Sequence, residues 1–313
     1  MREQKVMGMA SNMKTSEDLI LHWEKKFLNY LQEHWTGSSD GSHDLGHFQR
    51  VWTCAKQIAD EELIRNAECC ADTEVLLAAA YFHDFNSKSK DDPEASSSSL
   101  HSAKAAGAAL KEMGFPHQKI EAVKHAIHAH SFSANILPQT IEAKIIQDAD
   151  RMEAIGALGV ARTFYVSGLI GSLSYDVNDP LANNRPLDDK KFALDHFFTK
   201  LLKLQDAMQT DAGRRLAKER SAFLSDFAMR LAAEIKGKDI QPFGAIYISE
   251  IFHRAGKQRI KLFQSSDPLA RDRSLEPFYY ALDELLLTKI EQEDSVDFLQ
   301  YFVEQIAEDL QIL

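Results

Sequence analysis

The stretch from Ala78 to Phe85 reads AAAYFHDF, so a histidine and an aspartate stand together at the end of an apolar run. The run from Val75 to Phe82 carries no charge, which is typical of a helix that is buried on every side. A buried carboxylate without a partner is costly, and His83 and Asp84 therefore need one. A divalent metal ion would satisfy both side chains, which predicts further metal ligands elsewhere in the chain.

Two other segments carry such ligands on an apolar helical face. His47 falls on the face of a predicted helix whose apolar residues recur at helical spacing, namely Phe48, Val51, Trp52, Ala55 and Ile58. Asp148 belongs to a second stripe, with Ile141, Ile145, Ala149 and Met152, whereas Asp150 and Arg151 are expected on other faces of that helix. Three helices are thus predicted to direct metal ligands into the core, and the predicted set is His47, His83, Asp84 and Asp148.

The order His, His-Asp, Asp resembles the signature of the HD phosphohydrolase superfamily of metal-dependent enzymes. The flanking sequence resembles the bacterial YedJ-like branch of that superfamily. The segments that carry this resemblance are Asp44–Trp52, Ala126–Ser133, Glu142–Ile145, Gln147–Arg151 and Arg185–Lys190. The resemblance covers roughly residues 18 to 235. An HD dipeptide is trivial by itself, but the ordered set with these flanks is a specific signal.

The resemblance implies an all-α fold, an HD-type helical bundle, for residues 16–237. It also implies a phosphohydrolase that acts on a small phosphorylated substrate, a nucleotide or nucleoside triphosphate, by attack of a metal-bound water. We expect residues 1–15 to form a disordered leader and residues 238–313 to form a helical C-terminal extension of unknown role. Apolar residues in the extension predict that it packs on the domain or forms a homodimer contact.

Composition argues against three classes of protein: nucleic-acid-binding, disulfide-rich and membrane-spanning. Lys and Arg number 36 against 47 Asp and Glu, a formal net charge of −11, which disfavours a broad nucleic-acid-binding surface. The odd set of cysteines, Cys54, Cys69 and Cys70, argues against a disulfide framework and favours a reducing cytoplasm. No uncharged stretch reaches the ~20 residues that a membrane-spanning helix needs, so we expect no membrane partner.

The predicted donor set combines two imidazoles with two carboxylates. Such a nitrogen and oxygen set suits manganese, which we expect first, and also nickel, cobalt, iron or zinc, with magnesium matched less well. Four protein ligands leave open positions on an octahedral ion for water and a phosphate oxygen. Asp84 is a catalytic candidate as the acceptor of a proton from the attacking water. His130 is the second catalytic candidate, and we expect it to contact substrate phosphate or bound water.

Weaker candidates surround this set. Asp44 and Arg50 flank His47, and they are predicted either to orient the metal ligands or to pair with each other. Three basic residues at family-like positions could neutralise phosphate oxygens, with solvated charge as the alternative: Arg185, His196 and Lys200.

Two alternatives to a one-metal hydrolase stay open. The resemblance places second-metal ligands of binuclear HD proteins at His101 and His130, and a chain that held two irons would be a di-iron HD oxygenase. A non-catalytic nucleotide sensor or scaffold is the other alternative, although a complete set of ligands argues against a decayed site. Counting the metal ions and measuring turnover on a panel of nucleotides would separate these classes.

Overall fold

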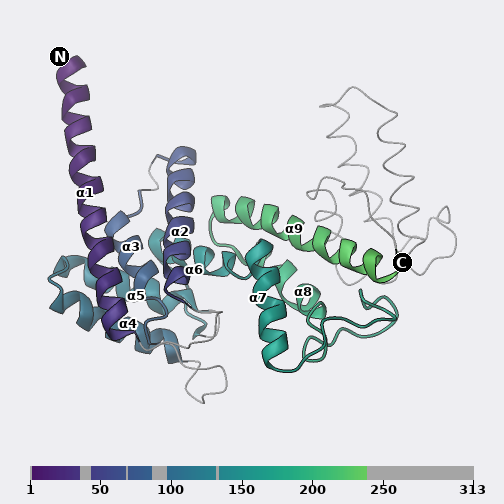
Figure 1. The fold of residues 1–313 in the computed structure, drawn as a ribbon. Helices are drawn as coiled ribbons and strands as arrows, with labels where there is room; N and C mark the ends of the chain where they lie inside the picture. The colour runs from purple at the N-terminus through teal and green to yellow at the C-terminus, as the bar shows by residue number, and fades with distance from the viewer. Residues whose placement is uncertain (1, 36–43, 68–69, 87–96, 132–133, 238–313) are drawn as a thin grey trace. The chain divides into compact units, whose positions relative to one another are not determined.

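Helices dominate the structure, a computed structural model that describes residues 2–35, 44–67, 70–86, 97–131 and 134–237 (Figure 1). Within these ranges the one strand-like pairing is an isolated bridge between Leu173 and Phe192. The all-α prediction is therefore confirmed. The predicted C-terminal extension, residues 238–313, lies outside the described residues.

Contacts divide the chain into two compact units, whereas the sequence predicted one domain over residues 16–237. The first unit comprises Met1–Glu153 and Met208–Arg214, and the second comprises Ala154–Ala207 and the chain from Arg215 onward. Domain boundaries are usually recognised from linkers rich in proline, glycine or polar residues. The sequence around the change at Glu153 has no such linker, which is why the division was not predicted.

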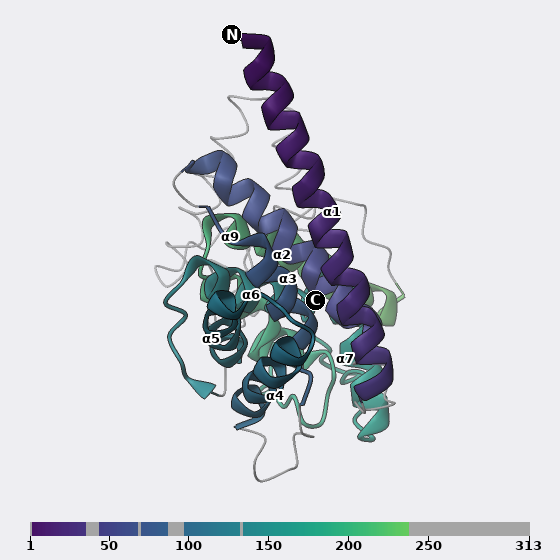
Figure 2. The same cartoon turned by 90° about the vertical axis from the view of Figure 1, so that its left-hand side faces the viewer.

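The first unit is a bundle of helices joined by loops. Its helices are α1 (Arg2–His34), α2 (Leu45–Arg65), α3 (Thr73–Phe82), α4 (Ser98–Glu112), the short 3-10 helix η2 (His117–Lys119), α5 (Ile120–His130) and α6 (Ile141–Met152). α3 lies at the centre and contacts α1, α2, α5 and α6 (Figures 1 and 2). Every residue from Val75 to Phe82 is buried, as an uncharged helix surrounded by other helices requires.

Helix α1 begins at Arg2, within the segment 1–15 for which the sequence predicts a disordered leader. The sequence from Arg2 to Thr15 contains no proline and consists largely of Met, Lys, Ala, Glu and Gln, all good helix formers, which explains why the helix extends to this point. Farther along α1, Trp23, Phe27 and Leu31 are buried. Phe27 packs edge-on against Phe82 at the end of α3, and α1 thereby covers the central helix.

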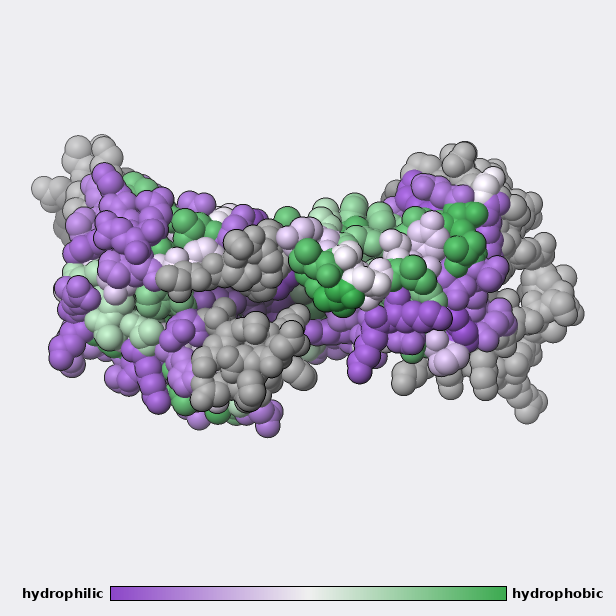
Figure 3. All heavy atoms as spheres, turned by 60° about the horizontal axis from the view of Figure 1, so that its bottom comes forward, coloured by the Kyte–Doolittle hydropathy of each residue, from purple (hydrophilic) through white to green (hydrophobic). Residues whose placement is uncertain are grey.

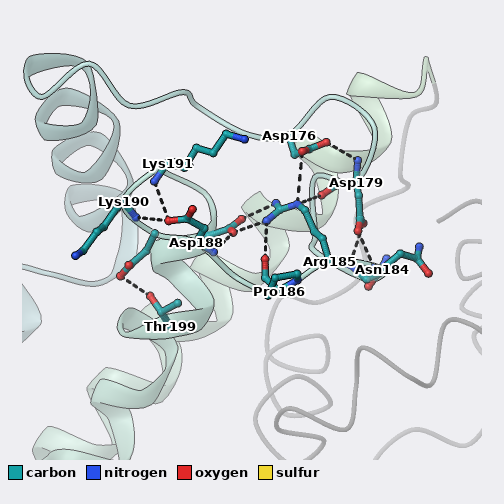
Figure 4. Close-up of polar contacts among 12 residues, drawn as sticks. Asp176, Asp179, Asn184, Arg185, Pro186, Asp188, Lys190, Lys191 and Thr199 are labelled. Atoms are coloured by element: carbon teal, nitrogen blue, oxygen red, sulfur yellow. Dashed lines mark hydrogen bonds and ion pairs between the residues drawn. The ribbon is translucent and has the colours of Figure 1, made fainter.

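The second unit contains shorter helices and a long polar loop. Its helices are α7 (Gly156–Leu169), α8 (Asp195–Thr199), the 3-10 helix η4 (Leu201–Ala207) and, from Arg215 onward, α9 (Asp211–Ile235), which begins in the first unit. Phe164, Phe197 and Phe227 pack their rings together, with centroids 5.8 to 6.2 Å apart, and join α7, α8 and α9. The loop between α7 and α8 is held by polar contacts around Arg185 (Figure 4).

Apolar residues also reach the surface, where Figure 3 shows them among hydrophilic ones. Among the described residues of the second unit, the exposed large apolar side chains are Leu158, Tyr165, Leu169, Ile170, Leu173, Val177 and Phe223. Among the described residues, no helix combines the length and the apolar character needed to cross a bilayer.

Candidate metal centre

Three metal-capable side chains meet where α2, the end of α3 and α6 come together. The Nε2 atoms of His47 and His83 lie 2.9 Å apart. Asp150 Oδ1 lies 3.7 Å from the first of these nitrogens and 3.6 Å from the second. Both histidines are buried, and the Asp150 side chain is 28% exposed. The site is therefore enclosed by helices but remains open to solvent through its carboxylate.

A second group shares His83 with the first. Asp84 Oδ2 lies 3.9 Å from His83 Nε2, and Asp84 Oδ1 lies 3.6 Å from His130 Nε2. In each group, one ligand atom from every residue lies within 4.8 Å of the others. The His/Asp cluster, as we call the combined set, consists of His47, His83, Asp84, His130 and Asp150. Because one imidazole Nε2 has a single lone pair, the two groups compete for His83 and do not form two independent metal sites.

The local backbone explains why these side chains meet. α3 ends at Phe82, so His83 and Asp84 stand in the turn that follows a fully buried helix. Asn86 N donates to Ser102 Oγ at 3.0 Å, which ties this turn to α4. His130 is the last residue of α5. Three of the five cluster residues thus lie at helix ends, where side chains can reach a common point without a helix in the way.

Hydrogen bonds on the other ring nitrogen set the tautomer of each imidazole. His83 Nδ1 lies 2.8 Å from Ala80 O, and His130 Nδ1 lies 2.6 Å from Ile127 O. A carbonyl oxygen can only accept, so the Nδ1 atoms carry the protons and donate. In the neutral ring, Nε2 then presents its lone pair to the cluster. This is the arrangement in which a metal-binding histidine is held.

The cluster favours positive charge. Burial lowers the pKa of His83, but Asp84 and Asp150 outweigh burial and raise it to about 9. Burial would raise the pKa of both carboxyl groups, and the neighbouring His83 and His130 instead hold these pKa values below their usual range. Two lone pairs 2.9 Å apart repel each other unless a proton or a metal ion lies between them. The donor set, three imidazoles and two carboxylates, fits a divalent transition metal.

The predicted ligand Asp148 is buried, as its apolar stripe indicated, but it lies outside the cluster. Its carboxylate accepts hydrogen bonds from Gln209 N, Thr210 N and Thr210 Oγ1, all at 2.7 to 2.8 Å. Burial raises its pKa above the usual value, although these hydrogen bonds oppose the shift. Residues two apart on a helix point about 200° away from each other. Asp150 therefore occupies the place in the cluster that the sequence assigned to Asp148.

Asp44 and Arg50, which were predicted to orient the metal ligands or to pair with each other, lie beside His47. Asp44 Oδ1 accepts a hydrogen bond from His47 N at 2.8 Å and caps α2. Arg50 Nη2 lies 3.6 Å from the same Oδ1, so these two residues also form the predicted pair. Arg50 Nε donates to Glu153 Oε2 at 2.7 Å, and that oxygen lies 3.5 Å from His47 Nδ1.

Glu153 was not predicted. Its side chain is 6% exposed, and burial would raise its pKa, but His47 and Arg50 lower that pKa overall. An ionised carboxylate on Nδ1 holds His47 in the tautomer that the other two histidines obtain from carbonyl groups. The sequence signal that could have found Glu153 is its position one helical turn after Asp150.

Arg185, predicted to bind phosphate, is already paired within the second unit. Its two terminal nitrogens donate to both oxygens of Asp195 at 2.6 and 2.8 Å. Its Nε donates to Asp179 O at 3.2 Å (Figure 4). Asp195 is fully buried and needs this charge, which leaves Arg185 a structural role. His196 Nδ1 lies 3.0 Å from Asp189 Oδ2, and Lys200 is exposed.

His101, the other predicted second-metal ligand, lies in α4 and belongs to neither group of metal-capable residues. His130 does lie in the cluster, beside Asp84. The structure therefore brings together His47, His83, Asp84 and His130 of the predicted site residues, and adds Asp150.

A helical bundle with histidines and aspartates converging from α2, α3 and α6 defines an HD-type protein. Residues 44–155 match the model of the HD domain family. The uncharacterized protein YpgQ of Bacillus subtilis (strain 168) is 34% identical over 222 residues, which cover 69% of this chain and 96% of YpgQ. The chain belongs to the HD domain family.

Two solved structures show the same likeness. YpgQ of Bacillus subtilis in complex with ADP is 31% identical, with a TM-score of 0.52 over 68% of this chain and 98% of that one. An HD-superfamily hydrolase from Bacillus thuringiensis is 27% identical, with a TM-score of 0.52 over 69% of this chain and 97% of that one. The likeness thus extends to nearly the full length of both relatives.

Proposed function

We propose that this chain is a metal-dependent phosphohydrolase whose substrate is a small phosphorylated molecule, a nucleotide or nucleoside triphosphate. The observation that carries the proposal is the approach of His47 Nε2 to within 2.9 Å of His83 Nε2 beside Asp150. Membership of a family that includes HD-superfamily hydrolases supports the same reaction class.

His47, His83 and Asp150 would hold the ion, and Asp84 lies beside His83, with its Oδ2 3.9 Å from His83 Nε2. When bound, a divalent ion supplies Lewis acidity and a water of lowered pKa. Manganese is our first expectation, because the donors are imidazole nitrogens and carboxylate oxygens. Glu153 and the carbonyl oxygen of Ala80 keep the two imidazoles oriented toward this position.

We assign Asp84 and His130 to proton transfer. The Asp84 side chain is 22% exposed and lies between His83 and His130, so a water entering from solvent can reach its oxygens. We assign to Asp84 the acceptance of a proton from the attacking water. His130 Nε2, which lies 3.6 Å from Asp84 Oδ1, can relay that proton to the leaving oxygen.

A nucleotide is favoured among small phosphorylated molecules because the relative YpgQ has been solved with ADP. The net charge of −11 gives no support to tracking a nucleic-acid backbone. A bound ion would instead neutralise a single phosphate group locally. The proposed partner is thus one small ligand, and a homodimer through residues 238–313 stays a separate proposal.

The test is a screen of metal against substrate on purified protein. The protein is stripped with chelator and reloaded with manganese, cobalt, nickel, iron, zinc or magnesium. It is then assayed on nucleoside mono-, di- and triphosphates, with separate detection of phosphate and pyrophosphate. We expect turnover that requires metal and disappears in His83→Ala. Stoichiometric metal without hydrolysis of any nucleotide would contradict the phosphohydrolase and favour a sensor. Two ions per chain would favour the di-iron class.

A further inference from the structure

Helix α6 carries two buried or half-buried aspartates with separate tasks. Asp150 lies in the His/Asp cluster, and Asp148 faces the segment that leads into α9. The Asp148 carboxylate is fully buried, and both of its oxygens accept hydrogen bonds from Gln209 and Thr210. A buried carboxylate with three donors is held in one rotamer, and the helix that bears it cannot turn without breaking those bonds.

The start of α9 is built to receive this carboxylate. Thr210 Oγ1 accepts a hydrogen bond from Gly213 N at 2.9 Å while donating to Asp148 Oδ2. A Cβ atom added at Gly213 would lie 2.4 Å from Asp148 Oδ2 and 2.6 Å from Thr210 Oγ1. Any larger residue at position 213 would force the Asp148 carboxylate or the Thr210 hydroxyl to move, so glycine preserves this close approach of α9 to α6.

A second carboxylate anchors the same turn from another helix. Glu62 Oε1, near the end of α2 that lies away from His47, accepts a hydrogen bond from Ala212 N at 2.6 Å. Glu62 is buried as well. The chain therefore offers a matched comparison, because both carboxylates bind the start of α9 but Asp148 alone shares a helical turn with a cluster residue.

We propose that Asp148 is a positioning residue for the metal centre, and that its bonds to Gln209 and Thr210 set the rotation of α6 and so direct Asp150 toward His47 and His83. Metal ligands must be placed to within about 0.2 Å of their preferred distances. A side-chain atom ~6 Å from the helix axis moves by about 1 Å when the helix turns by ~10°. Loss of the bonds at Asp148 is therefore enough to misplace Asp150.

The inference rests on the proposed metal site, and its test compares Asp148→Asn with Glu62→Gln. The readouts are the Mn²⁺ dissociation constant by calorimetric titration and the visible spectrum of the Co²⁺-loaded protein, both measured without substrate. We expect Asp148→Asn to weaken Mn²⁺ binding about tenfold, the scale of residues that orient metal ligands, and to alter the Co²⁺ spectrum. Glu62→Gln is expected to leave both metal readouts unchanged.

Equal metal readouts for the two variants, or an unchanged Mn²⁺ affinity in Asp148→Asn, would overturn the positioning role and leave the proposed metal site intact. If Asp148→Asn does not fold, Thr210→Val tests the positioning role. This variant removes one of the three hydrogen bonds to Asp148 and keeps its carboxylate. We then expect a weakening of Mn²⁺ binding of about threefold that exceeds the effect of Glu62→Gln. A wild-type chain that binds neither Mn²⁺ nor Co²⁺ would overturn the proposed function together with this inference.

Discussion

Arg50 Nε donates to Glu153 Oε2 at 2.7 Å, and the same oxygen lies 3.5 Å from His47 Nδ1. Arg50 is therefore linked to the His/Asp cluster through a carboxylate. The arrangement gives Glu153 two tasks, since it neutralises a half-exposed guanidinium and holds the tautomer of a buried histidine. A carboxylate beside Nδ1 of His47 also raises the basicity of Nε2, the atom that would bind the metal.

Glu153→Gln should weaken metal binding. The amide keeps the size of the side chain but loses the charge that orients His47, and we expect the Mn²⁺ dissociation constant to rise about tenfold. Calorimetric titration of the metal-free protein measures this change. Asp60→Asn is the control, because Asp60 pairs with Lys56 on the exposed face of α2 and should not alter metal affinity. Unchanged affinity in Glu153→Gln would rule out the orienting role.

Asp150→Asn should abolish stoichiometric metal content, whereas His101→Ala should retain it. Asp150 supplies the carboxylate of the group formed with His47 and His83, and His101 belongs to neither group. Elemental analysis of the purified variants gives the metal content directly. A full metal content in Asp150→Asn, or its loss in His101→Ala, would show that the ion lies elsewhere than in the first group.

The sequence predicted most of this site because its signals are local. An uncharged run that ends in His-Asp identifies a buried helix end, and the His47 stripe points to the same core. The choice between Asp148 and Asp150 failed for a physical reason. An apolar stripe marks one buried face, but both sides of α6 are covered, one by the cluster and the other by residues 209–213. Contacts between such distant segments leave no local pattern.

The same limit explains the residues that sequence reasoning missed or misassigned. Glu153, at the end of α6, contacts Arg50 of α2, which is about a hundred residues earlier in the chain. Arg185 pairs with Asp195, and the residues adjacent to Asp195 in the sequence do not indicate that it is buried. The charge of Arg185 and its family-like position suggested a phosphate contact, with solvated charge as the alternative. In the structure, Arg185 instead forms a bidentate pair with Asp195 of α8, and the sequence does not show this contact.

The stability of the metal-free protein should fall as the pH rises from 6.5 through 9. The folded pKa of His83 is raised to about 9 against an ordinary value of 6.5, with Asp84 and Asp150 outweighing burial. A raised folded pKa stabilises the protein fully below the unfolded pKa, and this contribution is lost as the pH passes the folded pKa. Melting temperatures measured in chelator across this range test the sign. Saturating Mn²⁺ should flatten the profile, because the ion takes the place of the proton. A melting temperature that rises over this window in chelator would contradict the assignment.

Arg185→Ala should destabilise the protein without weakening metal binding. Removing the guanidinium leaves the fully buried Asp195 without its charged partner, a change that costs about 3 kcal/mol or more in comparable buried pairs. Arg215→Ala is the matched control, since Arg215 pairs with Glu219 on an exposed face and such pairs contribute less than about 1 kcal/mol. Urea denaturation and Mn²⁺ titration of both variants separate the two roles. If Arg185→Ala instead kept its stability and raised the KM for a nucleotide, the guanidinium would be a substrate contact. The hydrogen bond from Asp188 N would then have to be sufficient to stabilise the buried Asp195 carboxylate.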